Sequence, residues 1–332
     1  MPPVNHEQIR SKMTKISEAI DDSLSHRFES DELKPIIDIL TYEQQNAGKR
    51  LRPALASMIS DTLGGDFKTT IDMATACELL HSASLMLDDT IDGDLIRRGK
   101  PSIHTAFGGG MTMMGTYVLA LLGLEIGITK SNELGKLLVD TLRRLVVGST
   151  SELTWSDWDG QTYYNIISDK TAALFEAPCQ IGAIVANRPE FRPIAKQYGH
   201  HLGMLYQLTD DYVDIAKSIK LDAPIGDIKN KITTVAVIHT YNYTGKPEIK
   251  HLLEMYRKKV DLPDEYLRMI IGEIAQCKSL IYLDSLINTE KECAIAEAKK
   301  FPDNEHRDYL LAMPQFMIDA QREEIDMPDF KE

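Results

Sequence analysis

The chain has few cysteines, and none of them is paired in sequence. Its 332 residues include four, Cys77, Cys179, Cys277 and Cys293, with no CxxC spacing among them. This excludes the common zinc motifs and gives no sign of a disulfide framework. The sequence also lacks a Pro/Ser-rich linker, a low-complexity tract and any clear repeat apart from two short acidic motifs. We therefore expect one domain covering residues 1–332.

Positive charge is also scarce. Asp and Glu outnumber Lys and Arg by 50 to 37, which gives a net charge of −13 and argues against nucleic acid as a partner. The first residues contain no apolar run of signal-peptide length, so we expect a cytoplasmic protein. The most apolar stretch, 111–128, is interrupted by glycines and by Glu125. It therefore favours a buried central helix over stable membrane insertion.

Strand patterns are missing as well. Apolar residues recur at helical spacing along nearly the whole chain, and no alternating run is flanked by hairpin turns. The sequence predicts an all-α protein, a bundle of many helices around a central cavity. Segment 69–92 contains no Gly or Pro and predicts one long buried helix, and 194–217 predicts a second.

What the chain does have is two acidic clusters of the same form, DDxxD, near the ends of those two helices. The clusters consist of Asp88, Asp89, Asp92, Asp210, Asp211 and Asp214. On a helix, the first and last carboxylates of each cluster share a face. Like charges about 4 Å apart repel by roughly 4 kcal/mol at an effective dielectric constant near 20, so a cation is expected between them. Oxygen ligands of this kind suit Mg²⁺, with Mn²⁺ as an alternative, and Mg²⁺ commonly adds a substrate phosphate.

Two basic clusters complement the acidic ones. Residues 48–53 contain Lys49, Arg50 and Arg52, and residues 97–100 contain Arg97 and Arg98. Arginine forks suit phosphate oxygens, and lysine acts as a point charge. A site with metal-bound carboxylates on one side and free cations on the other can hold two diphosphates in different ways.

As an ordered set, these motifs resemble the trans-isoprenyl diphosphate synthases (polyprenyl synthetases), with geranylgeranyl and medium-chain polyprenyl diphosphate synthases as the nearest kinds. The resemblance covers about residues 35–236. It rests on GKRLRP at 48–53, ELLHSAS at 78–84, DDTID at 88–92 with RRG at 97–99, KTA at 170–172, Gln207 with DDYVD at 210–214, and Lys231.

The resemblance implies a Mg²⁺-dependent prenyltransferase, usually a homodimer, that joins isopentenyl diphosphate to an allylic diphosphate (dimethylallyl, geranyl or farnesyl). The six aspartates would hold the metal. Isopentenyl diphosphate would be bound by Gly48, Lys49, Arg52, His81 and Arg98. The allylic diphosphate would be bound by Arg97, Lys170 and Lys231. Thr171 and Gln207 would line the reaction centre, beside the catalytic lysines Lys170 and Lys231.

The chemistry follows from these roles. Metal and cationic side chains stabilise the departing diphosphate, so that the allylic C–O bond ionises to a carbocation. The oxygens of Thr171 and Gln207 face that cation, the isopentenyl double bond attacks it, and the released diphosphate accepts the proton. Exclusion of water protects the cation.

Some positions depart from the family pattern. The stretch between Asp214 and Lys231 is short, and either Lys217 or Lys220 supplies the lysine expected there. In this family the residues just before the first DDxxD limit the length of the product. Here they are Ala83 and Ser84, both small, which predicts a product of twenty carbons or more.

Three other readings stay open. One is a class I terpene cyclase that uses a single allylic diphosphate, although a cyclase has no need of the 48–53 motif. Another is a non-catalytic partner subunit of a heteromeric synthase, although such a subunit need not keep all six aspartates. The third is that the charged motifs form only structural networks, although six close carboxylates outnumber convenient local partners.

Overall fold

The computed structural model describes residues 4–46 and 48–326. Helices dominate this part of the chain, so the predicted all-α class is confirmed. The strands within it are the two-residue β1 (Ile96–Arg97) and β2 (Lys100–Pro101), which pair antiparallel. The residues between them, Arg98 and Gly99, both have positive φ, as a two-residue hairpin turn requires. Strands this short show no alternation in the sequence.

The helices follow one another along the chain with short connections. They are α1 (His6–Phe28), η1 (Asp31–Ile36), α2 (Ile37–Gln45), α3 (Leu51–Leu63), α4 (Phe67–Asp92), α5 (Ile103–Phe107), α6 (Gly109–Lys130), α7 (Asn132–Thr154), α8 (Gly160–Ile167), η2 (Ser168–Ala172), α9 (Ala173–Val185), η3 (Pro189–Phe191), α10 (Arg192–Leu221), α11 (Gly226–Asn230), α12 (Val235–Tyr243), α13 (Pro247–Arg257), α14 (Asp264–Gln276), α15 (Ser279–Ala298), α16 (Arg307–Arg322) and η4 (Glu323–Asp326).

Helix α4 confirms the long helix predicted for 69–92. The Asp66 side chain caps its start by accepting a hydrogen bond from the Thr69 amide at 2.7 Å. Gly93 ends it in the left-handed conformation that favours glycine at this position (φ +72°). The first acidic cluster therefore occupies the last turn of the helix.

Helix α10 confirms the second long helix and extends the predicted 194–217 at both ends. It begins with a proline in its first turn, where no amide donor is needed, and ends at Asp222 in the left-handed conformation. The second acidic cluster lies in its C-terminal half.

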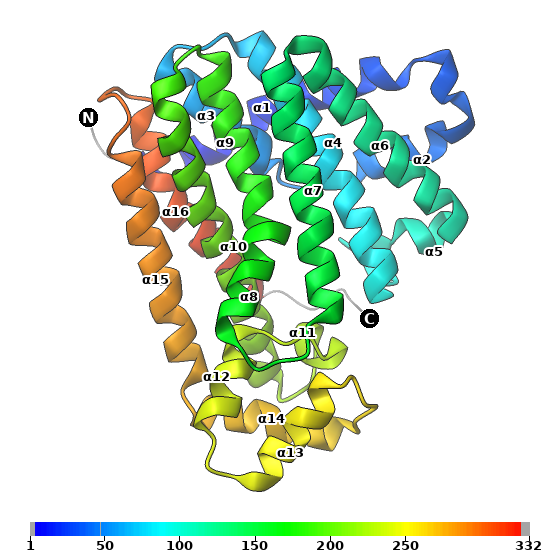
Figure 1. Cartoon of the computed structure of the whole chain (residues 1–332), viewed down its shortest axis with the longest axis vertical. Helices are drawn as coiled ribbons and strands as arrows, with labels where there is room; N and C mark the ends of the chain where they lie inside the picture. The colour runs from blue at the N-terminus through cyan, green and yellow to red at the C-terminus, as the bar shows by residue number, and fades with distance from the viewer. Residues whose placement is uncertain (1–3, 47, 327–332) are drawn as a thin grey trace.

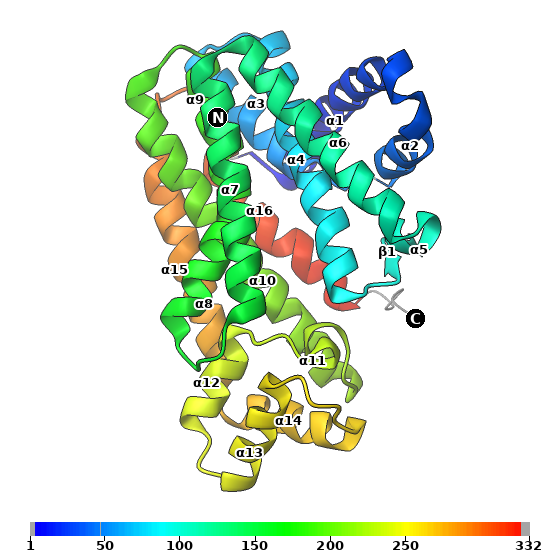
Figure 2. The same ribbon diagram turned by 45° about the vertical axis from the view of Figure 1, so that its right-hand side comes forward.

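The long helices run roughly along one axis, and α12, α13 and α14 lie beneath them (Figure 1). Figures 1 and 2 both show the C-terminal halves of α4, α7 and α10 pointing toward that lower end. The two acidic clusters are therefore brought to the same end of the bundle by helices that run in the same direction.

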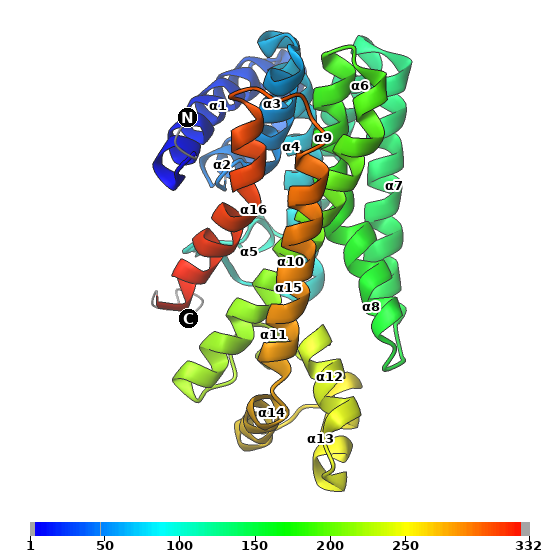
Figure 3. The same cartoon turned by 90° about the vertical axis from the view of Figure 1, so that its left-hand side faces the viewer.

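Helix α6 differs from the buried central helix that the sequence favoured. Glycines on one face let it approach α4 closely, and a Cβ on Gly123 would lie 2.9 Å from the Ala76 carbonyl oxygen. Its other face exposes Met113, Tyr117 and Leu121, among others. By length and composition it is a helix that could cross a membrane, but only 33% of its most apolar 18-residue stretch is buried within the protein. Figure 3 shows α6 and α7 at one edge of the molecule, opposite α1 and α16. The apolar pattern runs all round this helix, so it could not reveal which face stays uncovered.

Candidate active site

Each acidic cluster contains two kinds of carboxylate. Asp89 is buried and accepts hydrogen bonds from Arg97, including one from Nε at 2.6 Å. Asp88 is half-buried, and Asp92 is exposed. Asp89 is thus bonded to Arg97, whereas Asp88 is partly accessible beside Lys170 and Asp92 is exposed.

The second cluster repeats this division. Asp211 is buried and accepts hydrogen bonds from the Tyr163 hydroxyl and from Gln207 Nε2, the latter at 3.0 Å. Asp210 is exposed, and Asp214 is half-buried. Asp214 accepts a hydrogen bond from the Asp227 amide at 3.1 Å. The carboxylate oxygens of Asp89 and Asp211 keep further lone pairs beside these hydrogen bonds, so both residues stay candidates for the predicted metal role.

Glu152, at the end of α7, connects the two clusters. Burial raises the pKa of Asp88 to about 6, and the charges of Asp92 and Glu152 raise it too. Burial likewise raises the pKa of Asp211 to about 6, with Asp214 and Glu152 again contributing. The charge of Glu152 thus bears on one carboxylate of each cluster.

Lys170 lies within this acidic region. Its Nζ donates to Glu152 Oε2 at 2.6 Å and lies 3.6 Å from Asp88 Oδ1. Burial works against its charge, but Asp88 and Glu152 hold the pKa of Lys170 above its ordinary value. The amine is therefore charged and positioned where a diphosphate bound at the first cluster would meet it.

Thr171 and Gln207 are brought together as predicted. The Thr171 hydroxyl donates to Gln207 Oε1 at 2.8 Å, and Gln207 in turn donates to Asp211. Lys170 and Thr171 both belong to η2, a single π-helical turn between α8 and α9. Single π turns inside helices are frequent at functional sites.

The basic half begins with a close contact between Gly48 and Arg98. A Cβ on Gly48 would lie 2.6 Å from Arg98 Nη2, so a larger residue would displace this guanidinium from its present position. Lys49 is largely exposed and donates to Glu324 Oε1 at 3.2 Å. The third cation of the stretch, Arg50, is not available to a ligand. It is buried and donates to Glu78 and Asp21, both at 2.7 Å.

Arg52 and His81 form the inner part of the basic half. Arg52 Nη1 lies 2.8 Å from His81 Nε2, and the guanidinium stacks over the ring of Phe175. Burial and the neighbouring charge of Arg52 hold the pKa of His81 well below its ordinary value, so the imidazole is neutral. It therefore accepts from Arg52 through Nε2 and carries its proton on Nδ1.

Tyr206 lies between Arg52 of the basic half, 5.8 Å from its ring centroid, and Asp210 of the acidic half, one turn later on α10. Burial raises the pKa of this tyrosine, Asp210 raises it further, and Arg52 and Arg98 lower it. A single hydroxyl thus experiences charges from both halves of the predicted site.

Three lysines near the second cluster have distinct settings. Lys231 has a left-handed backbone at the end of α11, and its Nζ is 4.0 Å from Asp261 Oδ1. Lys220 is bound to Asp326 at 2.5 Å. Lys217 shares a face of α10 with Asp210 and Asp214, since these residues are spaced at seven and three positions. This placement favours Lys217 as the lysine that serves the second cluster.

The two small residues before the first cluster differ in exposure. Ala83 is 2% exposed and belongs to the hydrophobic core. Ser84 is half-buried and lies one helical turn before Asp88 on the same face. Of the pair, Ser84 is therefore the residue directed toward the acidic region.

The residues present fit a divalent cation that is completed by a substrate. Within residues 4–46 and 48–326, no three His, Cys, Asp or Glu side chains converge tightly enough to hold a metal by themselves. The outward carboxylates of each cluster are hard oxygen donors, and Mg²⁺ characteristically takes one or two such ligands together with waters and phosphate oxygens. All six predicted aspartates stay candidates, with Asp88, Asp92, Asp210 and Asp214 the more accessible and Asp89 and Asp211 the more buried.

Sequence reasoning missed Glu152 and Tyr163. A signal for Glu152 was present, because Arg144, Gly148 and Glu152 recur at four-residue spacing on one face of α7. Tyr163 had no such signal, since its bond to Asp211 joins residues 48 positions apart.

A separate groove lies away from these residues. It has a volume of about 480 Å³ and is lined by α1 and the start of α4, including Arg27, Phe67 and Asp72. Arg27 and Asp72 pair with each other there at 3.1 Å.

Comparison with known proteins agrees with this geometry. A sequence model of the polyprenyl synthetase family matches residues 34–272. The short chain isoprenyl diphosphate synthase of Methanocaldococcus jannaschii is 31% identical over 234 residues, covering 68% of this chain and 71% of the relative. The octaprenyl diphosphate synthase of Haemophilus influenzae is 27% identical over 289 residues, covering 84% and 86%.

A similar solved structure is the polyprenyl synthase of Caulobacter crescentus complexed with calcium and isoprenyl diphosphate. It is 25% identical, with a TM-score of 0.83 over 96% of this chain and 98% of that one. The sequence match, the fold and the paired acidic clusters agree, and the chain belongs to the polyprenyl synthetase family of trans-isoprenyl diphosphate synthases.

Proposed function

We propose that this prenyltransferase condenses isopentenyl diphosphate with an allylic diphosphate and depends on Mg²⁺ or a similar divalent cation. The observation that carries the proposal is that Arg52 lies 5.8 Å from the ring centroid of Tyr206, which precedes Asp210 by one turn of α10. The acidic end of α10 therefore lies on one side of this tyrosine, and Arg52 with its partner His81 lies on the other. Such a site has two separate places for diphosphates, whereas a cyclase needs only one.

The acidic side is suited to the allylic diphosphate. Asp88, Asp92, Asp210 and Asp214 would hold the divalent cations, and the cations would neutralise charge on the leaving diphosphate. The calcium and isoprenyl diphosphate bound by the Caulobacter relative support this assignment. Lys170 adds a fixed positive charge beside Asp88, and Arg97 and Lys231 are the further cations on this side.

The reaction centre would lie next to Thr171. Its hydroxyl oxygen and the Gln207 amide oxygen present partial negative charge, and neither is a strong base. They can therefore stabilise an allylic cation without capturing it. On the basic side, Gly48, Lys49, Arg52, His81 and Arg98 would hold isopentenyl diphosphate, and the released diphosphate would take the proton.

For the product, we propose twenty carbons or more. The relatives include a short chain synthase and an octaprenyl synthase, so similarity alone leaves the length open. The support comes from Ser84, a small side chain on the face of α4 that carries Asp88.

The Ser84→Phe variant tests this length. A ring at this half-buried position would stop the growing chain, and we expect the product to shorten by one or more isoprene units with little change in Tm. Ala83→Phe is the contrasting variant. Its ring would enter the hydrophobic core, where added volume lowers the free energy of unfolding by about 1–3 kcal/mol. Unchanged products in Ser84→Phe would refute the proposed influence of this position on product length.

We also propose a homodimer formed through the exposed apolar face of α6 and α7. Met113, Tyr117 and Leu121 on α6 and Val146 and Val147 on α7 are about half exposed or more. Apolar surface gathered on neighbouring helices is characteristic of protein interfaces. Both helices lie at one edge of the molecule (Figure 3).

Lys49→Ala separates condensation from cyclisation. Lys49 is 63% exposed at its side chain, so its removal leaves the fold intact. We expect KM for isopentenyl diphosphate to rise by about ten-fold or more, with KM for the allylic substrate unchanged. A cyclase or a non-catalytic partner subunit would show no incorporation of labelled isopentenyl diphosphate, even in the unmodified protein.

A further inference from the structure

A stripe of three residues on α7 follows the π-helical turn η2 along its length. Arg144, Gly148 and Glu152 lie four positions apart and therefore share one face of the helix. Arg144 contacts the start of η2, a Cβ on Gly148 would lie 2.7 Å from the Lys170 amide nitrogen, and Glu152 binds the Lys170 amine. One helix face thus contacts successive residues of the turn that carries Lys170 and Thr171.

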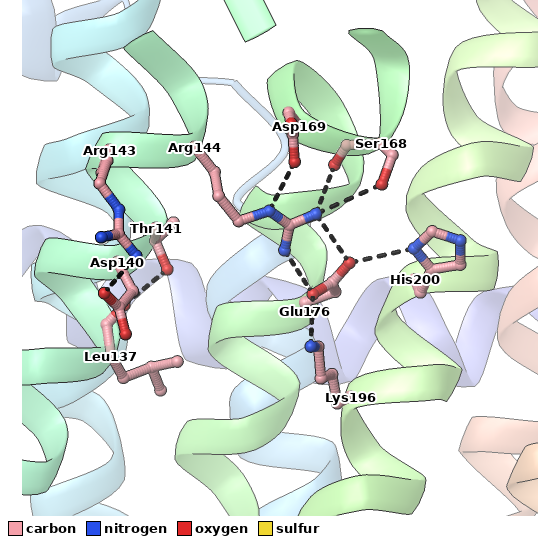
Figure 4. A network of polar contacts seen from close by, with 10 residues as sticks. All are labelled: Leu137, Asp140, Thr141, Arg143, Arg144, Ser168, Asp169, Glu176, Lys196 and His200. Carbon is pink, nitrogen blue, oxygen red and sulfur yellow. Dashed lines mark hydrogen bonds and ion pairs between the residues drawn. The ribbon is translucent and has the colours of Figure 1, made fainter. Parts of the chain in front are cut away.

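Arg144 makes most of these contacts. Its Nε donates to Asp169 Oδ1 at 2.7 Å, and its Nη2 donates to the Ser168 carbonyl oxygen at 2.9 Å (Figure 4). Its Nη1 donates to Glu176 Oε2 at 2.6 Å. All three guanidinium nitrogens are engaged, and two of them contact residues of the π-helical turn itself.

Glu176 anchors the arginine from the other side. It is 3% exposed, and His200 Nδ1 on α10 lies 3.0 Å from its Oε1 (Figure 4). Burial alone would raise the pKa of Glu176, but hydrogen bonds from His200 and Arg144 hold it below its ordinary value. The carboxylate is therefore charged, and it joins α7, α9 and α10 around η2.

Helix α10 closes on the turn from the opposite side. A Cβ on Gly203 would lie 2.4 Å from the Ala172 Cα, so glycine is needed for this approach. One turn later, Gln207 accepts the hydrogen bond from Thr171. The π-helical turn is consequently held between a stripe of α7 and a stripe of α10.

A π-helical turn is rare because its backbone is less favourable than that of an α-helix, so tertiary contacts must stabilise it. We propose that Arg144, together with Glu176, is a positioning residue that keeps η2 in its π-helical form, so that Lys170 and Thr171 point into the reaction region. This inference rests on the proposed prenyl transfer for its kinetic consequence, but the hold on the turn itself does not depend on it.

The test compares Arg144→Lys with Arg143→Lys. Arg143 is the preceding residue on the same helix, and its side chain donates a hydrogen bond to Asp140 within α7 (Figure 4). Lysine keeps the charge but offers one nitrogen, which cannot reach Asp169, Ser168 and Glu176 together. Hydrogen exchange of the amides in 168–173 is measured on the full chain, alongside steady-state kinetics.

We expect faster exchange across 168–173 by about ten-fold or more in Arg144→Lys only. We also expect kcat to fall by about 10- to 100-fold while KM for isopentenyl diphosphate stays within about two-fold. A general loss of folding would instead speed exchange throughout the chain. Unchanged exchange in 168–173, or an unchanged kcat in an active enzyme, would overturn the inference.

Gly148→Ala provides a second test should Arg144→Lys fail to fold. Its added methyl group presses on the Lys170 amide nitrogen at 2.7 Å and on Asp169, the partner of Arg144 Nε, so the same local increase in exchange is expected while Arg144 itself is kept. Gly160→Ala is its control, since a Cβ there meets nothing within 4 Å. If the unmodified protein makes no product, prenyl transfer fails, and the exchange data alone then decide whether Arg144 holds the turn.

Discussion

At the scale of single residues, the acidic clusters are not uniform. Asp89 and Asp211 are buried and bonded to Arg97 and Tyr163, whereas the other four aspartates are half-buried or exposed. A DDxxD spacing predicts where carboxylates lie along a helix. It does not predict which of them a distant arginine or tyrosine will bind, because those partners come from other elements of the fold.

Asp88→Asn and Asp89→Asn should therefore differ. We expect Asp88→Asn to lower kcat by about 10²- to 10³-fold, since it removes a charge that acts on the leaving group. Asp89→Asn should lower kcat by less than about ten-fold and mainly reduce Tm, because it weakens a buried ion pair. Equal losses of activity with equal Tm values would show that the division is wrong.

Glu43 gives a pH-dependent prediction away from the clusters. Burial raises its pKa from 4.5 to about 7. Between these values the folded chain binds the proton more tightly than the unfolded chain, so the contribution of Glu43 to stability falls as the pH rises. It is complete below about pH 4.5 and lost above about pH 7.

Glu43→Gln removes this titration. We expect the variant to be more stable than the unmodified protein by about 1–3 kcal/mol at pH 8, with no such gain at pH 4.5. Denaturant unfolding at the two pH values measures the difference. A gain of the same size at both values would assign it to packing instead of charge.

At the scale of elements, the sequence predicted the long helices well and the short ones poorly. Helices α4 and α10 follow from apolar spacing and from caps such as Asp66 and Gly93. The π-helical turn η2 has no such signal, because contacts from α7 and α10 stabilise it. The exposed face of α6 was also missed, since an apolar pattern does not say whether core or partner covers it.

Gly226→Ala tests the link between α10 and α11. An added Cβ would lie 2.1 Å from Asp214 Oδ2, and Gly226 has a φ of +48°. The substitution should displace the Asp214 carboxylate and lower kcat by about 10- to 100-fold. Gly245→Ala, where a Cβ meets nothing within 4 Å, should retain full activity. Retained activity in both variants would remove Asp214 from the site.

At the scale of the whole molecule, the bundle brings residues from α3, α4, α7, η2 and α10 to one end. The family could be predicted from the order of short motifs, and the all-α class from the helical spacing of apolar residues. Pairings across the site, such as Glu152 with Lys170, became visible only once the helices were packed.

The proposed dimer is a prediction at this scale. Leu121→Glu on α6 places a charge on a side chain that is 63% exposed, and we expect it to halve the molar mass measured by light scattering. Ile281→Glu on α15, where the residue is 68% exposed, should leave the mass unchanged. A monomeric unmodified protein would contradict the proposed interface.

The most direct measurement of the central claim is incubation of the purified protein with Mg²⁺, labelled isopentenyl diphosphate and one allylic primer at a time. The primers are dimethylallyl, geranyl and farnesyl diphosphate, and the dephosphorylated products are sized by chromatography. We predict labelled products of twenty carbons or more that disappear when the metal is chelated. Failure to incorporate label with any of the three primers would contradict the claim.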